Sequence, residues 1–225
     1  MMNKYMKILF FLSLLGLQCC KEEEIISYPT TYSNTPVTEY TIKAFTQNGE
    51  ITDSLKLNHL IRMSGDLLTG MDKYNSEGDF VATYLSPEKV LINKSDSENT
   101  DTLDIHKIDD LIYWEKKDTI SSFFRHSITF KYKPLYYEEI PIPISSGYPC
   151  IVKYKPCYYV KQDGQDLVLP MFDMIFYIGD SRTPIPGINI NNEFCVDSIS
   201  YFGINDTLIV KEYNLILKQR IHRLK

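Results

Sequence analysis

The chain lacks the short motifs that identify common classes of enzyme. No serine stands in a G-x-S-x-G nucleophile elbow, and no glycine-rich loop of the kind that holds phosphate groups occurs. Histidine is scarce, and its four positions are widely separated: His59, His106, His126 and His222. No H-E-x-x-H or C-x-x-C spacing is present, so the sequence indicates no zinc site, and we expect neither a catalytic residue nor a cofactor.

Concentrated positive charge is absent as well. The 225 residues include 24 Lys and Arg against 29 Asp and Glu, a net charge of −5, and no basic stretch is interleaved with aromatic residues. A nucleic-acid partner is therefore not expected. Long apolar runs are also missing, because the longest, residues 8–17, is shorter than the roughly 20 apolar residues that span a bilayer.

This short apolar run indicates where the protein is located. Lys4 and Lys7 precede the run and a pair of cysteines follows it, which is the pattern of a secretory leader. The tetrapeptide Leu17-Gln18-Cys19-Cys20 resembles the lipobox of bacterial lipoproteins, in which a leucine stands three residues before the modified cysteine and a small residue one before it. The resemblance implies a leader over residues 1–19, lipid attachment at Cys20 and a membrane as partner. Cys19 is the alternative modified residue, with a less suitable glutamine before it.

Four charged residues follow the cysteine pair directly: Lys21, Glu22, Glu23 and Glu24. They resemble the surface-export signal of Bacteroidetes-type lipoproteins, which implies an outer-membrane protein exposed on the cell surface. The alternatives are a solvated tether and a position on the periplasmic face of the membrane.

The rest of the chain divides into a linker, one domain and a tail. Residues 20–36 read as the lipidated anchor and a polar linker, residues 37–217 as a single β-rich domain, and residues 218–225 as a basic tail. One helix is expected at about 53–68, because capping candidates precede an apolar stripe at helical spacing. That stripe consists of Leu57, Leu60, Ile61 and Leu68.

Short alternating segments separated by turn residues predict antiparallel hairpins over the remainder of the domain. The expected pairs are 80–85 with 90–93, 102–108 with 111–115, 151–160 with 167–178, and 194–202 with 207–217; a further strand is expected at 123–132. Strands and helices do not alternate as they do in the βαβ units of parallel sheets. The sequence thus predicts a mainly β fold, an antiparallel meander forming either a lipocalin-like barrel or a β-sandwich. The order of strand, Asn48-Gly49-Glu50-Ile51 turn, helix and hairpins resembles lipocalin-like domains of lipoproteins from the same bacterial group.

The most apolar part of the mature chain, residues 167–178, should be a core strand. By period two, one face should point into the core: Phe172, Met174, Phe176 and Ile178. The other face is mixed and should be covered only in part, by the helix: Met171, Asp173, Ile175 and Tyr177. Because Pro170 has no N–H, regular pairing should begin after it or break there.

Other candidate sites have simpler interpretations. Asp104, His106, Asp109 and Asp110 could hold a metal or act as acid and base, but they read as an exposed hairpin tip. Glu138-Glu139 could be half of a glycosidase carboxylate pair, but reads as solvated charge.

Cysteines and tyrosines complete the list of candidates. A Cys150–Cys157 disulfide requires a turn between the two residues, and buried free thiols, including Cys195, are the alternative. The 17 tyrosines are typical of β-sheets, although an exposed group of them could bind sugars. Those clustered in the C-terminal half are Tyr136, Tyr137, Tyr154, Tyr158, Tyr159, Tyr177 and Tyr201.

Three hypotheses of function follow. The first is a lipid-anchored cell-envelope protein whose non-enzymatic β domain binds a small ligand or a glycan, since an anchor and aromatic strands are present and catalytic motifs are missing. The second is a structural or assembly subunit that binds another envelope protein. The third is a hydrolase without a recognisable local motif.

Overall fold

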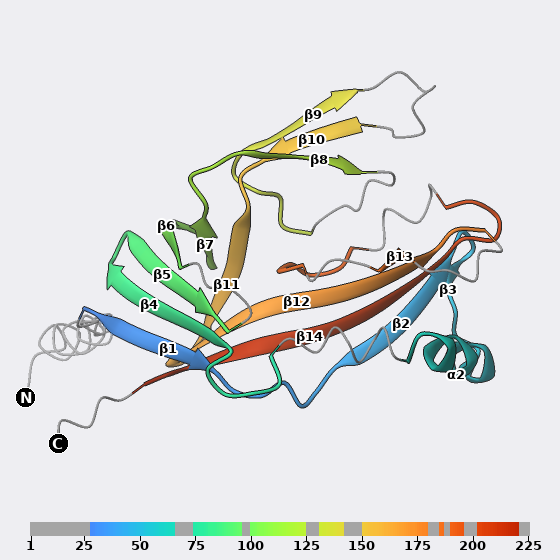
Figure 1. Cartoon of the computed structure of the whole chain (residues 1–225), viewed down its shortest axis with the longest axis horizontal. Helices are drawn as coiled ribbons and strands as arrows, with labels where there is room; N and C mark the ends of the chain where they lie inside the picture. Colours follow the sequence, from blue (N-terminus) through green and yellow to red (C-terminus); the bar gives the residue numbers. More distant parts are fainter. Residues whose placement is uncertain are drawn as a thin grey trace, which may run out of the picture.

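Eight antiparallel strands close into a barrel in the computed structural model, which describes residues 28–65, 74–95, 100–124, 131–141, 150–179, 185–186, 190–195 and 202–220 (Figure 1). Around the barrel the order is β12, β11, β7, β6, β5, β4, β1 and β14, and pairing of β12 with β14 closes it. The prediction of a mainly β, lipocalin-like barrel with one short helix is confirmed. The barrel strands are β1 (Thr30–Asn34), β4 (Phe80–Ser86), β5 (Lys89–Lys94), β6 (Asp101–Ile108), β7 (Leu111–Glu115), β11 (Cys157–Asp163), β12 (Asp166–Tyr177) and β14 (Thr207–Gln219).

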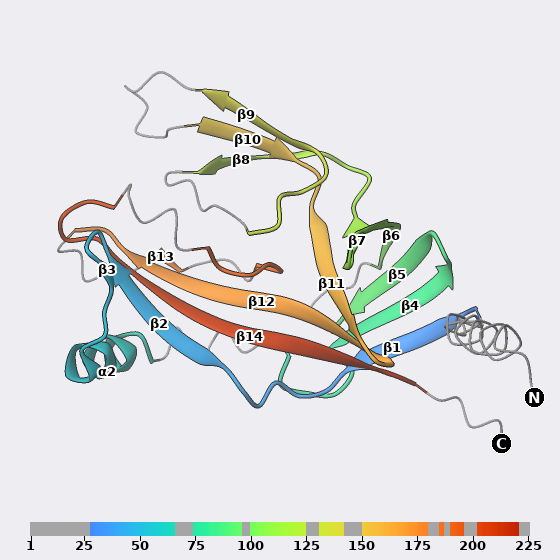
Figure 2. The same cartoon turned by 180° about the vertical axis from the view of Figure 1, so that it is seen from behind.

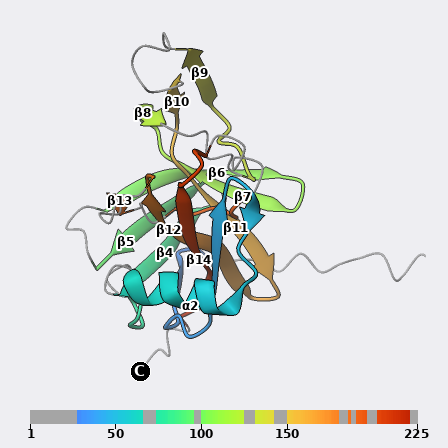
Figure 3. The ribbon, with the colours of Figure 1, turned by 90° about the vertical axis from the view of Figure 1, so that its right-hand side faces the viewer.

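Two barrel strands continue beyond the barrel into an extension of the sheet, here called the wing. It consists of residues 171–177 of β12 and 207–213 of β14, flanked on one edge by β2 (Thr41–Thr46) and β3 (Gly49–Glu50) and on the other by β13 (Ile185–Pro186). The helix α2 (Ser54–Met63) lies against one side of the wing (Figures 1 and 2). A small second sheet lies on the opposite side (Figure 3), with the order β8 (Ile120–Phe124), β10 (Cys150–Tyr154) and β9 (Tyr137–Pro141).

Side chains from all eight strands fill the barrel interior. Trp114, Phe80 and Leu215 are fully buried there, and the ring of Tyr84 meets that of Trp114 edge-on at 5.8 Å between centroids. Removing such groups from water contributes about 25 cal/mol for each Å² of apolar surface. The barrel therefore has a packed core.

Both faces of the wing are covered, by different parts of the chain. On one face Phe172 packs with Phe45 and Phe194, and on the other Ile175 and Tyr177 pack against the helix. The expected inward position of Phe172 and the cover of Ile175 and Tyr177 by the helix are confirmed. The expectation that the face of Asp173 is only partly covered is wrong.

Asp173 is fully buried because β12 changes surroundings along its length. The face that carries it points into the barrel at Leu169 and toward the helix at Ile175, so Asp173 lies between two cores. Met174 and Phe176, on the face expected to be the core, are only half-buried.

Pro170 does not interrupt β12, contrary to expectation. The strand pairs continuously with β14 through Pro170 and Asn214. Phe172 exchanges both backbone hydrogen bonds with Ile190, so the even-numbered amides of β12 face away from β14. The missing N–H of Pro170 therefore costs no bond to β14, and its carbonyl accepts a hydrogen bond from Asn191 Nδ2 at 3.1 Å.

The ordered sheet extends beyond the expected boundaries at both ends. Strand β1 falls within the segment 20–36 expected to be a linker, and β14 extends into the expected tail as far as Gln219. The sequence did not predict β1 as a strand because its residues are mostly polar. Asn34 is fully buried, where it accepts hydrogen bonds from the amides of Gly78 and Phe80 at 3.1 and 2.9 Å.

The hairpins 80–85 with 90–93 and 102–108 with 111–115 are confirmed as β4–β5 and β6–β7. The expected strand 151–160 is instead two strands. Residues 155–156 separate them, so that β10 joins the small sheet and only β11 pairs with β12. The helix is shorter than expected, ending at Met63, and residues 66–73 lie outside the described part of the chain.

Candidate functional site

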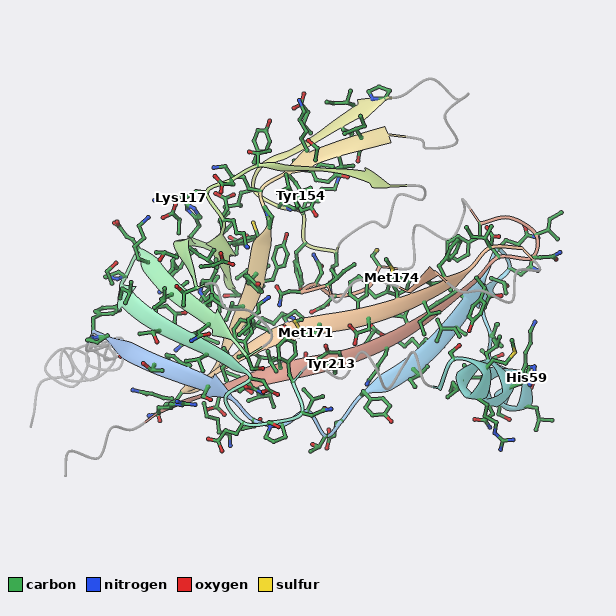
Figure 4. The ribbon with its side chains drawn as sticks, viewed as in Figure 1. His59, Lys117, Tyr154, Met171, Met174 and Tyr213 are labelled. Atoms are coloured by element: carbon green, nitrogen blue, oxygen red, sulfur yellow. The ribbon has the colours of Figure 1, made fainter. Side chains whose placement is uncertain are left out.

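A groove of about 1180 Å³ crosses the outer face of β12 and β14 where the barrel passes into the wing. Its floor is formed by Val168 and Pro170 and by their partners on β14, Ile216 and Asn214. These side chains point outward, because the alternate residues of both strands fill the barrel. Met171 and Tyr213, which also line the groove, pair across the two strands and are labelled in Figure 4.

The first wall is the connection from β1 to β2, residues 35–41. Thr35 donates from its amide to the carbonyl of Ile216 at 2.9 Å, and Thr41 pairs with Glu212. Residues 36–40 therefore lie opposite only residues 213–215 of β14, so the connection bows away from the strand. Tyr40 is 56% exposed on this wall.

The second wall is held by the carboxylate of Glu193. It accepts hydrogen bonds from the ammonium groups of Lys131 and Lys161 and from the hydroxyl of Tyr132 at 2.9 Å. Partial burial acts to raise its pKa, but these three hydrogen bonds outweigh burial and lower the pKa to about 2. Glu193 is therefore ionised at any neutral pH.

Neighbouring amides fix this wall to the barrel. Asn192 is buried; its Oδ1 accepts from the amide of Tyr132 at 3.2 Å and its Nδ2 donates to the Tyr132 carbonyl at 2.9 Å. Asn191 accepts from the Tyr159 amide. The ring of Tyr132 lies 5.5 Å from that of Tyr159, which lies 5.3 Å from that of Tyr113. Asparagines and packed aromatic rings thus support the lysines and Glu193 from behind.

Charge in the groove is almost fully paired. Glu212 bonds to Lys43 at 2.6 Å, and Glu193 is shared by Lys131 and Lys161, a cluster with one net positive charge. Glu39 is the lining acid with no ion pair among the described residues. The described lining includes no histidine or cysteine. A carboxylate with a pKa of about 2 donates no proton at neutral pH, so Glu193 is suited to accept hydrogen bonds and not to act as a general acid.

The candidates suggested by the sequence lie elsewhere. Glu138 and Glu139 are exposed on β9, where they accept hydrogen bonds from the hydroxyls of Tyr136 and Tyr137 at 3.2 and 2.6 Å. His59 lies on α2 (Figure 4).

The expected hairpin tip is present at the end of β6. Asp109 and Asp110 are exposed in its turn, with Asp109 at a φ of 53°. Nε2 of His106 lies 3.7 Å from Glu115 Oε2, and Asp104 forms an ion pair with Lys89. Nowhere in the described ranges do three or more His, Cys, Asp or Glu residues gather as metal ligands do. His126 and His222 lie outside these ranges.

Cys157 does not have the properties of an activated thiol. Cys157 is a free, half-buried thiol whose pKa is raised to about 11 by burial, and it donates to the carbonyl of Lys155 at 3.3 Å. The free-thiol interpretation therefore holds for Cys157. Cys195 is half-buried, and the side chain of Cys150 lies outside the described part.

Among the tyrosines singled out in the sequence, Tyr201 lies outside the described residues, and none of the others lines the groove. Tyr154 lies in the small sheet (Figure 4), Tyr177 is buried against the helix, and Tyr158 packs against the barrel core. The groove uses Tyr40 and Tyr213 instead. Its lining comes from segments near residues 35–41, 131, 161, 168–171, 193–194 and 212–216, which no local pattern connects.

The anchor residues Cys20, Lys21, Glu22, Glu23 and Glu24, with Cys19, lie outside the described residues. Among the helices that are described, none has the length and apolarity to cross a bilayer. In comparisons with known proteins, the chain matches no family model, no curated protein and no solved structure.

Proposed function

We propose that the protein is a lipid-anchored component of a bacterial cell envelope that binds a neutral glycan in the groove, without catalysis. One observation carries the proposal: the groove is open and lined by the exposed ring of Tyr40 and by hydroxyl groups, and the charges at it balance, with Lys43, Lys131 and Lys161 against Glu39, Glu193 and Glu212. An anionic ligand would have to compete with Glu193 for Lys131 and Lys161.

The lining matches the two chemical aspects of a sugar ring. Val168, Pro170 and Ile216 offer apolar surface to C–H groups, and the exposed ring of Tyr40 offers a stacking face with a polar tip. Hydroxyls on the same wall, those of Thr38 among them, are donors and acceptors for sugar hydroxyls.

Anchoring at Cys20 is compatible with an accessible groove. Strand β1 starts at Thr30, at the end of the molecule far from α2 (Figures 1 and 2). The residues between Cys20 and Thr30 reach at most about 35 Å when extended. An anchor there would hold the barrel end nearer the membrane and leave the wing and groove farther out.

The test is binding of neutral oligosaccharides to the leaderless protein, measured by calorimetry with Tyr40→Ala and Tyr136→Ala as a matched pair. Both tyrosines are exposed, but only Tyr40 lines the groove. Tyr40→Ala should weaken binding at least tenfold, about 1.4 kcal/mol, and Tyr136→Ala should not. Binding that survives Tyr40→Ala unchanged would remove the groove as the site.

A second candidate function is that of an assembly subunit. It is favoured by three large apolar side chains at the small sheet, Ile120, Leu135 and Tyr136, each at least 40% exposed. Charged substitutions at these three residues should abolish co-purification of an envelope protein if this face is an interface. If co-purification is unchanged, this face is not an interface, and ligand binding in the groove is the remaining proposal.

A further inference from the structure

We infer that Glu193, Lys131 and Lys161 together bind two adjacent hydroxyl groups of the glycan, so that the groove selects a sugar with an unsubstituted vicinal diol. This inference rests on the proposed function, because it names the part of the sugar that the second wall would recognise. The observation behind it is the arrangement of hydrogen-bond donors and acceptors on that wall, where all three charged side chains line the groove.

The carboxylate of Glu193 can accept a further hydrogen bond from a ligand. An ionised carboxylate has about four lone-pair sites on its two oxygens. Groups of the protein already donate to both oxygens: Lys161 and the hydroxyl of Tyr132 bond to Oε1, and Lys131 bonds to Oε2. Oε2 therefore has an acceptor site left, and the side chain is 25% exposed.

The two ammonium groups have donors left as well. An ammonium group carries several N–H donors, and Glu193 accepts one bond from each lysine. Lys131 and Lys161 are 52% and 42% exposed, so a ligand can reach the remaining donors. One ligand hydroxyl can thus donate to Oε2 and accept from Lys131, while the next hydroxyl accepts from Lys161.

Two adjacent hydroxyls complement this set of groups better than an anion does. The oxygens of a carboxylate are spaced much as the oxygens of neighbouring ring hydroxyls are, so both hydroxyls can lie against Glu193 with a lysine on each side. An anionic group only accepts hydrogen bonds, so it would leave the site on Oε2 unfilled and would face the charge of Glu193. A hydroxyl both donates and accepts, and so uses the carboxylate and the lysines together.

The wall holds these groups in position before a ligand arrives. The ammonium groups of Lys131 and Lys161 lie 5.4 and 5.5 Å from the centroid of the Tyr132 ring. The backbone of Tyr132 bonds to the buried side chain of Asn192, the residue before Glu193. Side chains fixed by their neighbours lose little freedom on binding, so the hydrogen bonds to the diol keep most of their favourable free energy.

The discriminating experiment measures binding of cellotetraose and maltotetraose to the leaderless protein, each beside its derivative methylated at O2 and O3. Methylation keeps the sugar neutral and removes the hydrogen that bonds to Glu193, so it should weaken binding at least tenfold. If no neutral glycan binds, the proposed function fails. If methylation has no effect, or a glycan without a vicinal diol binds as tightly, the proposed function stands and this inference fails.

Glu193→Gln separates hydrogen bonding from crowding by the added methyl groups. Loss of the carboxylate should abolish most of the preference for the unmethylated sugar, whereas a steric clash with the methyl groups would persist in the variant. Glu212→Gln is the matched control and should keep the preference, because Glu212 also lines the groove and also pairs with a lysine. A preference that survives in Glu193→Gln would overturn the inference.

Lys131→Met tests the donor side of the site. The variant should fold, because Lys131 is half-exposed and Glu193 keeps Lys161 and Tyr132 as partners. It should bind the unmethylated tetrasaccharide about fivefold more weakly, as expected for the loss of one hydrogen bond. Unchanged binding would contradict the assigned role of Lys131.

A competition experiment distinguishes a diol site from an anion site. Sodium acetate, exchanged for sodium chloride at constant ionic strength, should not displace the bound tetrasaccharide from the native protein. Displacement would show that the two lysines select an anionic group, and the inference would then be wrong.

Discussion

At the scale of single residues, the buried charges facing each other across β12 and β14 should matter most for stability. Asp173 and Lys211 are register partners that are 0% and 4% exposed, and the ammonium of Lys211 lies 4.5 Å from the centroid of the Tyr40 ring. Opposite charges at directly opposed positions attract, and removing one buried member typically costs about 3–5 kcal/mol.

Asp173→Asn should therefore lower the melting temperature of the leaderless protein by roughly 10 °C. Lys211→Met should have a similar effect, and the double variant should lose less than the sum of the two. Strictly additive losses in thermal melts would show that the two charges do not interact.

Glu193 should make the free energy of unfolding depend on pH in the acid range. Its pKa is lowered to about 2 from an ordinary value of 4.5, so its contribution is complete above pH 4.5 and disappears as the pH falls toward 2. Allowing for solvent screening of a partly exposed carboxylate, the contribution is of the order of 1–2 kcal/mol.

Glu193→Gln should lower the melting temperature at pH 7. The difference in melting temperature between the native protein and this variant should then shrink as the pH approaches 2. Glu138→Gln, an exposed carboxylate on β9, is the control. If the melting temperatures of the native and Glu193→Gln proteins differ by the same amount at every pH from 7 to 2, the assigned pKa is wrong.

At the scale of elements, the helix α2 depends on its cap and on the wing. Asp53 accepts from the amides of Leu55 and Lys56 at 2.8 and 3.0 Å, and no residue of the ten-residue helix is buried. A helix this short is marginal alone. Asp53→Ala should cost about 1 kcal/mol and raise amide exchange in residues 54–63 while the barrel strands stay protected. Exchange that rises equally in the barrel would indicate that the helix and the barrel unfold together.

Local patterns predicted the elements whose partners are close in sequence. The β4–β5 and β6–β7 hairpins follow from alternation and turn residues, and the helix follows from its apolar stripe. Strand β1 was missed because its stability comes from distant partners, such as the amides that bond to the buried Asn34. No alternation reveals that kind of burial.

The groove was beyond sequence reasoning for the same reason. It exists because β14 changes partner from β1 to β2, which depends on the register of β14 against two strands at the other end of the chain. The face of Asp173 was misjudged because a single strand serves two cores, and polarity alone gave no sign that the acid is enclosed.

At the scale of the whole molecule, Cys20 should decide where the protein is held. Acyl chains contribute about 0.8 kcal/mol for each buried CH₂, and several chains hold a protein firmly. Cys20→Ala should release the protein to the soluble fraction, whereas Cys19→Ala should remain in the membrane after a carbonate wash. The reverse result would make Cys19 the modified residue.

Exposure on the cell surface should depend on Lys21, Glu22, Glu23 and Glu24. Replacement of all four by alanine should leave lipidation intact and hide the domain from protease added to whole cells. Protease sensitivity equal to that of the native protein would count against an export role for these charges.

The shared strands of barrel and wing have a kinetic consequence. Eleven register pairs join β12 to β14 without interruption from Leu167 to Tyr177, so the two parts cannot swing about a hinge without breaking that ladder. A ligand arriving where they meet encounters a surface that is already assembled and has no slow closure to wait for. Association should then follow a single exponential whose rate rises linearly with ligand concentration, and release should be set by the contacts of the bound ligand alone.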